Sequence, residues 1–378
     1  MVKPQILVFI DWYSPGFKAG GPVRSMMNLV DHLRDTIDFN IVTSDTDYTA
    51  DIPYPGITAD RWTTLPGGEK VWFASRSGIK RASWRRILKQ RKWDVVYING
   101  IYSYWFSILP LLLSGGMRRV VAVRGMLAEG PMRHGRMKKE YFIHAMKLLG
   151  FYRNVEFQAT NGNEVEEVKK WIGRDAIIHL VPNVPRKLAV VPPPARRKRA
   201  GELRLVSAAR IAVEKNTLFA IECLNGVNGE VTLDLYGPIY DGAFWELCQA
   251  AIAALPSNIA VSHKGSIVPD QVPAMLDGYH ALYMPSQGEN FGHTMLESLA
   301  AGLPLVISDR TPWCDLRSNN AGWDLSLNDP QLFTAAVQEL VDMDAEQYTM
   351  LSQGAFALGA RYLADPIPVE KSLALFTP

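Results

Sequence analysis

The chain has 378 residues, of which 48% are hydrophobic and 21% charged, so its composition is that of a folded protein and excludes a disordered one. Its longest apolar run, residues 105–113, is far shorter than the ~20 residues that a membrane-spanning helix needs. The apolar run at residues 5–10 is too short for a secretory signal, and three cysteines without a CxxC spacing argue against a disulfide framework. We therefore expect a cytoplasmic protein of two domains, because this length exceeds one ordinary core.

The charge is distributed unevenly. Residues 1–183 contain 26 Lys and Arg against 17 Asp and Glu, and residues 184–201 contain six basic residues and no acidic one. Residues 202–378 contain 8 basic residues against 21 acidic ones. Either the surface has drifted in composition or the basic half faces an anionic partner, and we favour the second interpretation. A basic, amphipathic segment at residues 133–147 is expected to contact an anionic membrane surface peripherally.

The first element is a buried strand over residues 5–10, followed by a loop and a helix that begins near Val23. Pro22 fits the first turn of that helix, so Gly20 and Gly21 lie at a strand-to-helix junction. Backbone N–H groups at such a junction can approach a phosphate, but most Gly-Gly pairs are plain turns. Both interpretations remain open at this point.

Further strands are predicted at residues 39–43, 70–74, 95–98 and 120–123. The strand at residues 39–43 is followed by an Asp-x-Asp triplet, Asp45 to Asp47, and a similar triplet occurs at residues 342–344. Asp-x-Asp is compatible with a metal-bound diphosphate, but acidic turns after strands are commonly caps and no histidine lies nearby. We interpret both as non-metal positions and expect no metal site.

Polar residues follow two of these strands. Asn99 comes at the end of one strand, and Arg124 comes directly after the strand at residues 120–123. An arginine at the carboxyl end of a strand can bind phosphate or an acidic acceptor, and it can equally form a surface salt bridge. These two residues and Arg24, in the first predicted helix, are candidates for the acceptor side of a site.

A basic, proline-rich stretch at residues 184–201 is typical of an inter-domain linker. The pattern of strands then restarts at residues 203–208, 231–236 and 259–263. Arg210 and Lys215 flank the loop after the first of these strands. Two cations there could neutralise a departing diphosphate.

Residues 286–297 lie between apolar runs at 280–285 and 305–308. A helix predicted over residues 294–301 ends at Gly302, so the segment has the order strand, loop, helix, strand. Glu289 lies in the loop and Glu297 is expected in the first turn of the helix. Ligands of open α/β sheets bind at the carboxyl ends of strands, which places both carboxylates at a candidate pocket.

The chain resembles the GT-B glycosyltransferases, and more narrowly family GT4, the retaining transferases that use nucleotide sugars. The resemblance spans the whole chain and rests on the motifs Gly20-Gly21-Pro22-Val23-Arg24, Arg124-Gly125-Met126-Leu127, Arg210…Glu214-Lys215-Asn216, Glu289-Asn290-Phe291-Gly292…Glu297 and Ala301-Gly302-Leu303-Pro304. It implies an α/β fold of two Rossmann-like domains with parallel sheets that face each other across a cleft. The expected parts are an acceptor-side domain at residues 1–183, a linker at 184–201, a nucleotide-sugar domain at 202–362 and a tail at 363–378 that crosses back to the first domain.

The resemblance also implies residue roles. Arg210 and Lys215 would hold the donor diphosphate, Glu289 would contact the donor sugar, and Glu297 would accept hydrogen bonds from the ribose. The remaining donor contacts would come from Gly20, Gly21, Lys264, Gly265, Asn290, Phe291 and Gly292. The leaving phosphate would take the acceptor proton, so that neither a strong protein base nor a metal or other cofactor is expected. The expected partners are a nucleotide-sugar donor and a glycan or lipid-linked acceptor of surface polysaccharide synthesis, with no nucleic acid.

Two other functions fit the same fold. A nucleotide-sugar 2-epimerase would bind the same donor, but it would need acid and base carboxylates at the sugar ring, and none can be assigned. A non-catalytic, donor-binding subunit of a transferase complex would be expected to lack one of the residues Arg210, Lys215, Glu289 and Glu297, and all are present. Many relatives have a histidine near the acceptor, whereas this sequence has Asn99-Gly100 and Arg124-Gly125 at the corresponding strand ends.

Overall fold

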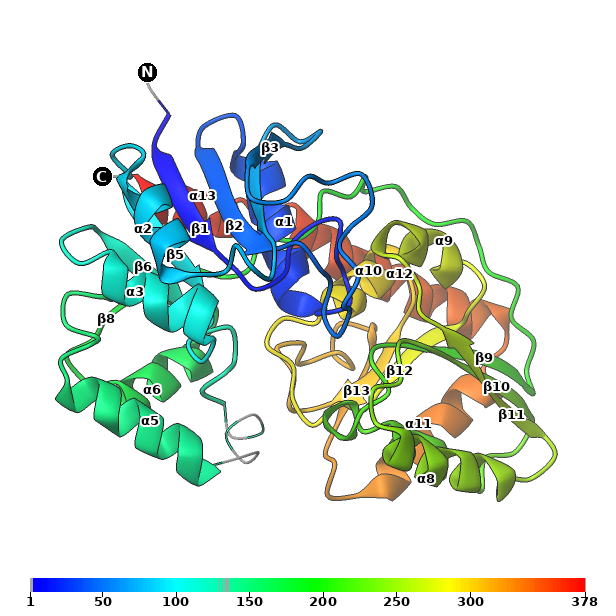
Figure 1. Cartoon of the computed structure of the whole chain (residues 1–378). Helices are drawn as coiled ribbons and strands as arrows, with labels where there is room; N and C mark the ends of the chain where they lie inside the picture. The colour runs from blue at the N-terminus through cyan, green and yellow to red at the C-terminus, as the bar shows by residue number, and fades with distance from the viewer. Residues whose placement is uncertain (1–2, 129, 131, 133–135, 378) are drawn as a thin grey trace. The chain divides into compact units, whose positions relative to one another are not determined.

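The computed structural model describes residues 3–128, 130, 132 and 136–377. The chain divides into two compact units (Figure 1). The N-terminal unit consists of Met1–Lys187 together with Pro366–Pro378, and the C-terminal unit is Leu188–Asp365. Each unit contains one mainly parallel sheet with helices on both faces, which confirms the predicted α/β fold class. No helix in the described part of the chain has the length and apolar character needed to cross a membrane.

The N-terminal unit has an eight-stranded sheet in the order β3-β4-β2-β1-β5-β6-β7-β8. Its neighbouring strands are parallel except β3 and β4, which are antiparallel. The strands are β1 (Gln5–Phe9), β2 (Asp38–Ser44), β3 (Trp62–Thr64), β4 (Lys70–Ala74), β5 (Val95–Asn99), β6 (Arg119–Ala122), β7 (Glu156–Ala159) and β8 (Ile177–Leu180). The helices are α1 (Gly21–Leu33), α2 (Arg81–Lys89), α3 (Leu109–Leu113) after a π-helical turn at Tyr104–Ile108, α5 (Arg136–Leu148), α6 (Gly162–Trp171) and α13 (Ile367–Phe376).

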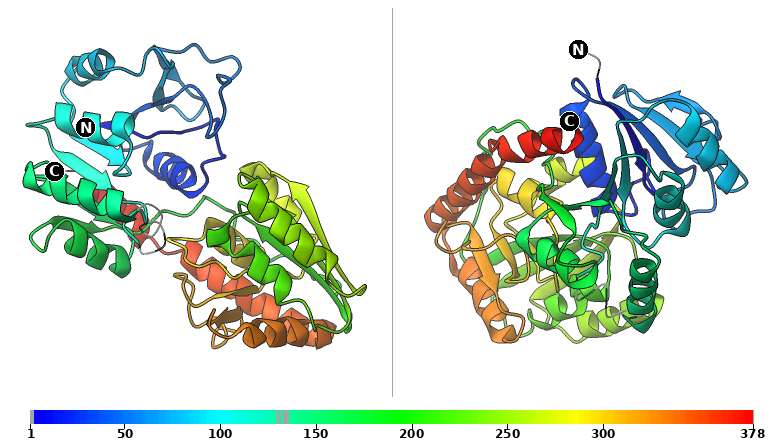
Figure 2. Two further views of the ribbon diagram at one scale, coloured as in Figure 1. Left: turned by 60° about the horizontal axis from the view of Figure 1, so that its bottom comes forward. Right: turned by 90° about the vertical axis from the view of Figure 1, so that its left-hand side faces the viewer.

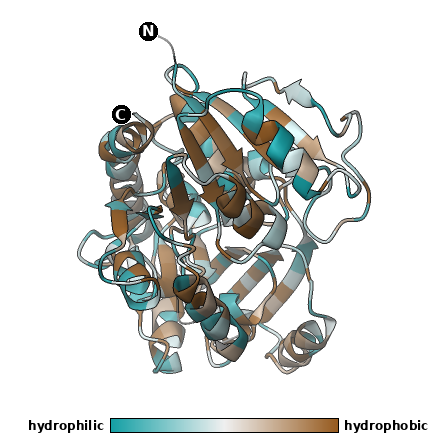
Figure 3. Ribbon diagram, turned by 60° about the vertical axis from the view of Figure 1, so that its left-hand side comes forward, coloured by the Kyte–Doolittle hydropathy of each residue, from teal (hydrophilic) through white to brown (hydrophobic). Residues whose placement is uncertain are grey.

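The central strand β1 is buried on both faces, as its unbroken apolar sequence predicts. Leu7 and Phe9 pack into the layer formed with α2, α3 and α6. Ile6 and Val8 pack into the layer formed with α1 and α13. Alternate residues of a strand point to opposite faces, so one short run fills both cores. The strands of this sheet are mostly brown, the colour of hydrophobic residues, in Figure 3.

The end of the chain belongs to the N-terminal unit. Helix α13 packs beside α1, and the two helices lie next to each other in Figure 2. The ring of Phe376 makes edge-on contacts with Phe39 and Tyr97, at centroid distances of 5.8 and 5.1 Å. The last helix therefore completes the hydrophobic core of the unit in which the chain begins.

The C-terminal unit has a six-stranded sheet in the order β11-β10-β9-β12-β13-β14, and all its neighbouring strands are parallel. The strands are β9 (Glu202–Ala208), β10 (Glu230–Tyr236), β11 (Ile259–Gly265), β12 (Ala281–Met284), β13 (Leu305–Ser308) and β14 (Gly322–Leu325). The helices are α7 (Thr217–Glu222), α8 (Gly242–Ala253), α9 (Val272–Leu276), α10 (His293–Ala300), α11 (Pro330–Asp342) and α12 (Ala345–Leu363), with short 3-10 turns at Val213–Lys215 and Pro269–Gln271.

Two helical layers cover this second sheet. One core contains residues of α7, α8 and α11, and the other contains residues of α9, α10 and α12. The strand order reverses between β9 and β12, with β10 and β11 on one side and β13 and β14 on the other. In open parallel sheets such a reversal marks the place where ligands bind, beyond the carboxyl ends of the two strands. The loops after β9 and β12 are therefore the first place to look for a site.

Candidate active site

The loop after β9 carries two predicted site residues. β9 ends at Ala208, and a single 3-10 turn at Val213–Lys215 leads into α7. Nη2 of Arg210 lies 3.0 Å from Oε1 of Glu214, so these two side chains form an ion pair within the loop. Asn216 has a left-handed backbone with φ of 59°, a conformation that asparagine tolerates better than most residues. The loop thus ends in a tight turn that fixes Lys215 beside the start of α7.

Lys215 contacts the loop after β12. Its Nζ atom donates to Oε1 of Glu289 at 2.6 Å, and the Ser286 hydroxyl donates to the same oxygen at 3.0 Å. The side chains of Lys215 and Glu289 are 19% and 13% exposed, so both are largely shielded from water. Ion pairs shielded in this way are screened less than surface pairs. The structure therefore brings together two residues that were assigned to one site from their sequence motifs.

Three backbone contacts hold the loop that carries Glu289. The N–H of Gln287 donates to the Glu214 carbonyl at 3.0 Å, which joins the loops after β12 and β9. The N–H of Glu289 donates to the Arg310 carbonyl at 3.2 Å. The Trp313 indole donates to the carbonyl of buried Phe291 at 2.8 Å. The loop is thus fixed at its beginning, middle and end.

Ser286, Arg310 and Trp313 were not among the predicted site residues. Ser286 opens the loop between β12 and α10, and the segment with Arg310 and Trp313 directly follows β13. Because β12 and β13 are neighbouring parallel strands, residues after both strands lie at the same edge of the sheet. The position of Arg310 and Trp313 could therefore have been used to find them.

Helix α10 begins at His293, directly after the loop. Its N-cap Gly292 has φ of +76°, and a Cβ atom there would lie 2.7 Å from the sulfur of Met295 and 3.1 Å from Nε1 of Trp313, so glycine is favoured. The Thr294 hydroxyl donates to the Ala208 carbonyl at 3.3 Å. This contact places the helix N-terminus, with its partial positive charge, beside the end of β9.

Glu297 is buried in α10. The helix begins at His293, so Glu297 is its fifth residue and starts the second turn. The expectation that it lies in the first turn was wrong, because the helix begins one residue earlier than the apolar pattern indicated. Asn290, Phe291 and Gly292 form the end of the loop before α10. Their proposed contacts with a donor sugar, and that of Glu297 with a ribose, stay predictions.

Lys264 and Gly265 lie at the end of β11. Nζ of Lys264 is 3.4 Å from Oδ1 of Asp234 on β10, so its described ion pair is with the neighbouring strand and not with Glu289. Gly265 accepts a hydrogen bond from the N–H of Gly237 at 2.9 Å. Gly237 follows β10, and a Cβ atom there would lie 2.0 Å from the Ala209 carbonyl oxygen. Close backbone packing thus joins the ends of β9, β10 and β11.

In the N-terminal unit, Gly20 and Gly21 lie where the sequence predicted, at the start of α1. Gly20 is the N-cap with φ of +77°, and a Cβ atom on either glycine would meet no atom within 4 Å. Buried Asp47 holds the preceding loop, because its carboxylate accepts from the N–H groups of Phe17 and Lys18 at 3.1 and 3.3 Å. Asp47 therefore caps backbone groups. The approach of this backbone to a phosphate stays a prediction.

Arg124 joins the ends of several strands. Its Nε donates to Oδ1 of Asn99 at 2.9 Å, its Nη1 to Oδ1 of Asn183 at 2.6 Å, and its Nη2 to the Tyr97 hydroxyl at 2.8 Å. These acceptors are neutral, so the alternative of a surface salt bridge is wrong. Asn99 and Arg124 are brought together, as two acceptor-side candidates should be. Asn183 and Tyr97 were not selected from the sequence.

The third acceptor-side candidate, Arg24, lies in the first turn of α1, where its N–H donates to the Gly20 carbonyl at 3.2 Å. Asp11 was missed, although it comes shortly after the central strand β1. Its Oδ1 accepts from the Ser103 hydroxyl at 2.6 Å, and burial raises the pKa of the carboxyl group. A polar residue after a buried central strand was a signal that the sequence contained.

The described residues contain no group of three or more His, Cys, Asp or Glu side chains placed to hold a metal ion. The chemistry that these residues offer is that of cations and hydrogen-bond acceptors. Two cations and a helix N-terminus gather around the loops after β9 and β12. Such an arrangement suits a diphosphate, and the nearby carboxylates suit the hydroxyl groups of a sugar.

Part of the chain resembles known proteins in sequence. Residues 193–357, which make up most of the C-terminal unit, match the family described as Glycosyl transferases group 1. The UDP-N-acetylglucosamine--peptide N-acetylglucosaminyltransferase GtfA subunit of Streptococcus agalactiae is 23% identical over 241 residues. That match covers 60% of this chain and 44% of the relative, so the chain aligns with less than half of that protein.

Solved structures resemble the whole chain. Anabaena Alr3699/HepE in complex with UDP and glucose superposes with a TM-score of 0.73 and 13% identity, and 98% of each chain is covered. Sucrose-phosphate synthase from Thermosynechococcus elongatus gives a TM-score of 0.71 and 13% identity, with 99% of this chain and 97% of the other covered. WaaG, a glycosyltransferase of lipopolysaccharide biosynthesis, gives 0.65 and 14%, with 99% of each chain covered. These similarities show the GT-B fold.

Proposed function

Since residues 193–357 match glycosyl transferases group 1 and the chain has the GT-B fold, we propose a retaining glycosyltransferase of surface polysaccharide synthesis. It moves a sugar from a nucleotide-diphosphate sugar to a glycan or lipid-linked acceptor. The observation that carries this proposal is the shielded contact between Lys215 and Glu289, which joins the loops after β9 and β12. It lies where the strand order reverses, beside the N-terminus of α10.

The proposed reaction uses this geometry as follows. The bond between the sugar C1 and the diphosphate oxygen breaks, and negative charge gathers on the departing diphosphate. Arg210, Lys215 and the α10 N-terminus stabilise that charge. The acceptor oxygen forms the new bond to C1 on the face that the diphosphate leaves, and its proton passes to a phosphate oxygen. The protein therefore needs no strong base, and two cations supply the charge that a metal ion would otherwise provide.

The carboxylates bind the donor in this proposal. Glu289 has its Oε1 occupied by Lys215 and Ser286, and a carboxylate can accept further hydrogen bonds from sugar hydroxyls. Glu297 accepts from the ribose, and Lys264 and Gly265 lie near the base. The acceptor is placed by Arg24, Asn99 and Arg124 of the N-terminal unit. Glu289 thus orients the sugar and does not cleave the glycosidic bond itself.

We propose a uridine-based donor as the first to test. The relative from Streptococcus agalactiae is described as using UDP-N-acetylglucosamine, and Alr3699/HepE has been solved with UDP-glucose. The protein is incubated with UDP-, GDP-, ADP- and dTDP-sugars, with and without a lipid-linked acceptor, and release of nucleoside diphosphate is measured. NMR of the product then gives the anomeric configuration. Retention supports the proposal, and inversion or the absence of any transfer contradicts it.

The same relative favours a second candidate function, because it is described as a subunit. In that case the chain binds the donor as part of a transferase complex. Donor turnover by the isolated chain distinguishes the two candidates. A chain that binds UDP but transfers sugar only after a partner is added would support the complex.

We also propose that the protein is cytoplasmic and touches the inner face of a membrane through α5. The segment predicted for this role was 133–147, of which residues 133–135 lie outside the described residues. In α5, Met137, Tyr141 and Leu148 are 82%, 83% and 91% exposed, and their spacing of four and seven places them along one helix face. Lys138 and Lys147 add positive charge. Exposed apolar residues flanked by lysines are typical of helices that lie in an anionic membrane surface.

Vesicle co-sedimentation tests this contact. Vesicles with anionic lipid should sediment more protein than neutral vesicles, and Tyr141→Ser with Leu148→Ser should remove the difference. The matched control is Leu332→Ser, which changes an exposed leucine in α11 of the C-terminal unit. Equal sedimentation with neutral and anionic vesicles contradicts the proposal.

A further inference from the structure

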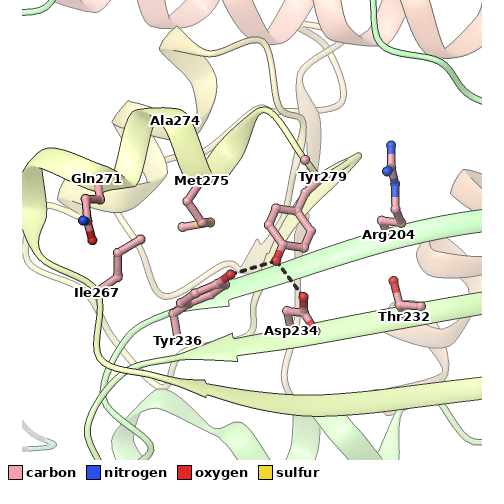
Figure 4. Close-up of a pocket in the computed structure, with 10 residues that line it drawn as sticks. Arg204, Thr232, Asp234, Tyr236, Ile267, Gln271, Ala274, Met275 and Tyr279 are labelled. Carbon is pink, nitrogen blue, oxygen red and sulfur yellow. Dashed lines mark hydrogen bonds between the residues drawn. The ribbon is translucent and has the colours of Figure 1, made fainter.

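A pocket of about 620 Å³ lies on the C-terminal unit, over one face of β9 and β10 (Figure 4). Its volume falls within the range of about 300–1,000 Å³ that is usual for small-molecule sites. It is lined by Arg204, Thr232, Asp234, Tyr236, Ile267, Gln271, Ala274, Met275, Gly278 and Tyr279. Arg210, Lys215, Glu289 and Glu297 are not among these residues. Lys264, which is proposed to lie near the donor base, pairs with the lining residue Asp234, so the pocket borders the donor-base end of the candidate active site.

The pocket is polar because successive side chains of a strand point to opposite faces of the sheet, and the polar ones of β10 share one face. On β10, Val231, Leu233 and Leu235 are buried in the core with α7 and α8. Thr232, Asp234 and Tyr236 lie on the opposite face of the strand and line the pocket. Helix α9 has five residues, and of these Val272 and Leu276 pack into the second core. This face of β10 is therefore open to a ligand.

Hydrogen-bonding groups are arranged in a chain across the pocket. The hydroxyls of Tyr236 and Tyr279 are 3.2 Å apart, and the Tyr279 hydroxyl donates to Oδ2 of Asp234 at 2.7 Å (Figure 4). Lys264 lies 3.4 Å from Oδ1 of the same carboxylate. Each carboxylate oxygen can accept more than one hydrogen bond, so Asp234 keeps acceptor capacity for ligand hydroxyls. Thr232 and Gln271 add a hydroxyl and an amide to the same lining.

One end of the pocket is positively charged. The guanidinium of Arg204 contacts the ring of His280, with 3.3 Å between Nη2 and Nε2, and the described residues place no carboxylate within ion-pair distance of it. Burial, with smaller contributions from the charges of Arg204, Lys198 and Arg196, lowers the pKa of His280 to about 4. A neutral imidazole leaves the positive charge of Arg204 uncompensated.

Arg196 adds to this positive charge. Its side chain is 6% exposed, and its Nη2 lies 3.6 Å from Oδ1 of Asp277, a carboxylate that is 65% exposed. Asp277 precedes Gly278, which lines the pocket. A carboxylate so exposed compensates a buried guanidinium only weakly, because water screens it. Both arginines therefore favour an anionic group at this end.

We propose that this pocket binds an acidic saccharide, with its carboxylate or phosphate group on Arg204 and its hydroxyls on Asp234, Thr232 and Gln271. The faces of Tyr236 and Met275 pack against the sugar ring. The proposal rests on the proposed function only in taking the ligand to be a glycan. A site of this kind would hold an acidic polysaccharide at a distance from the reacting sugar.

Direct binding to the intact protein tests the proposal, with the donor site saturated by UDP. The probes are a glucuronate-containing tetrasaccharide and its carboxyl-reduced, neutral form, with glucose 6-phosphate and glucose as a second pair. We expect at least one acidic probe to bind, and its neutral counterpart to bind about tenfold or more weakly, because a charge-assisted hydrogen bond is lost. The pair that shows this difference identifies the anionic group as carboxylate or phosphate.

Variants locate the bound probe. Arg204→Gln should weaken binding of the acidic probe about tenfold or more, whereas Arg317→Gln, at an exposed arginine paired with Glu339, should not change it. If Arg204→Gln does not fold, Gln271→Ala and Thr232→Val replace it and should each weaken binding. Absence of binding of both acidic probes to the folded protein, or equal binding of acidic and neutral probes, overturns the proposal.

The candidate active site provides the remaining control. If Lys215→Ala abolishes binding of the saccharide and Arg204→Gln does not, the probe occupies the active site, and the pocket proposal is overturned while the proposed function stands. If the saccharide binds through Arg204 but no nucleotide sugar is turned over, the proposed function fails and the pocket proposal stands.

Discussion

Lys215 and Glu289 are 74 positions apart in the sequence, yet Nζ of the lysine lies 2.6 Å from Oε1 of the glutamate. The contact joins two loops that follow the neighbouring parallel strands β9 and β12. The contact is made by the charged ends of the two side chains, so a substitution of either residue changes the charge at this place directly.

Glu289→Gln keeps the shape of the side chain and removes its negative charge. We expect kcat/KM for sugar transfer to fall about 10- to 100-fold, because a charge-assisted hydrogen bond contributes about 1.5–3 kcal/mol. Steady-state kinetics with the preferred donor measure the effect. Glu339→Gln changes an exposed carboxylate paired with Arg317 and should leave kcat/KM within about twofold. Equal values for wild type and Glu289→Gln would remove Glu289 from the site.

Arg124→Lys keeps the positive charge and cannot reproduce three hydrogen bonds in a planar arrangement. The side chains of Asn99, Asn183 and Tyr97 then lose their donor. We expect the free energy of unfolding to fall by about 2–4 kcal/mol, measured by urea denaturation followed by tryptophan fluorescence. Arg174→Lys, at an exposed position of the same unit, is the control. Unchanged stability together with lost acceptor-dependent turnover would instead assign Arg124 to acceptor binding.

Gly237→Ala should destabilise the C-terminal unit more than Gly20→Ala destabilises the N-terminal unit. Both glycines have a positive φ, which costs a residue with a Cβ atom about 1–3 kcal/mol. Only at Gly237 would the new Cβ atom also meet backbone, 2.0 Å from the Ala209 oxygen. Thermal unfolding of both variants measures the difference. Equal shifts in Tm would show that the packing between the ends of β9 and β10 is looser than described.

Stability should depend on pH through His280. Its pKa falls from 6.5 to about 4 on folding, chiefly through burial. The Nδ1 atom accepts from the N–H of Arg204 at 3.1 Å, and Nε2 lies 3.0 Å from the Arg197 carbonyl, an arrangement that fits the neutral ring. Between pH 6.5 and about 4, the imidazole of His280 binds a proton in the unfolded chain and stays neutral in the folded chain. The stabilisation is therefore complete above pH 6.5 and is lost as the pH falls towards 4, by about 3 kcal/mol.

Urea denaturation at pH 7.5 and pH 4.5 tests this prediction against His280→Asn, which removes the titrating group. The variant should lose less stability than wild type between the two pH values. A parallel decrease in both proteins would assign the pH dependence to other groups.

Much of the fold follows from the sequence, because buried parallel strands form continuous apolar runs. The strands β1, β2, β4, β6, β9, β10, β11 and β13 lie within one or two residues of the predicted ranges. The strands that were not predicted include two short ones, β3 and β14. β3 has three residues, none of them buried, and pairs antiparallel at the sheet edge, so its sequence carries no apolar run. A segment of three residues is too short for its sequence to show which face is buried by a neighbouring strand.

The candidate site was predictable in part. The motifs gave Arg210, Lys215 and Glu289, because charged residues after buried strands are conspicuous. They did not give the partner of each charge. Arg210 pairs with Glu214, Lys264 with Asp234, and Arg124 with three neutral groups. Such pairings depend on strand order and side-chain direction, which the sequence of one strand does not contain.

The central claim is that the contact between Lys215 and Glu289 lies in a glycosyltransferase active site. The most direct measurement is the rate of nucleoside diphosphate release, with donor and acceptor present, for wild type, Lys215→Ala and the exposed control Arg317→Ala. Loss of a cation that stabilises the leaving diphosphate should lower the rate about 100- to 1,000-fold in Lys215→Ala, and Arg317→Ala should match wild type within about twofold. A Lys215→Ala protein that turns over donor and acceptor at the wild-type rate would contradict the account.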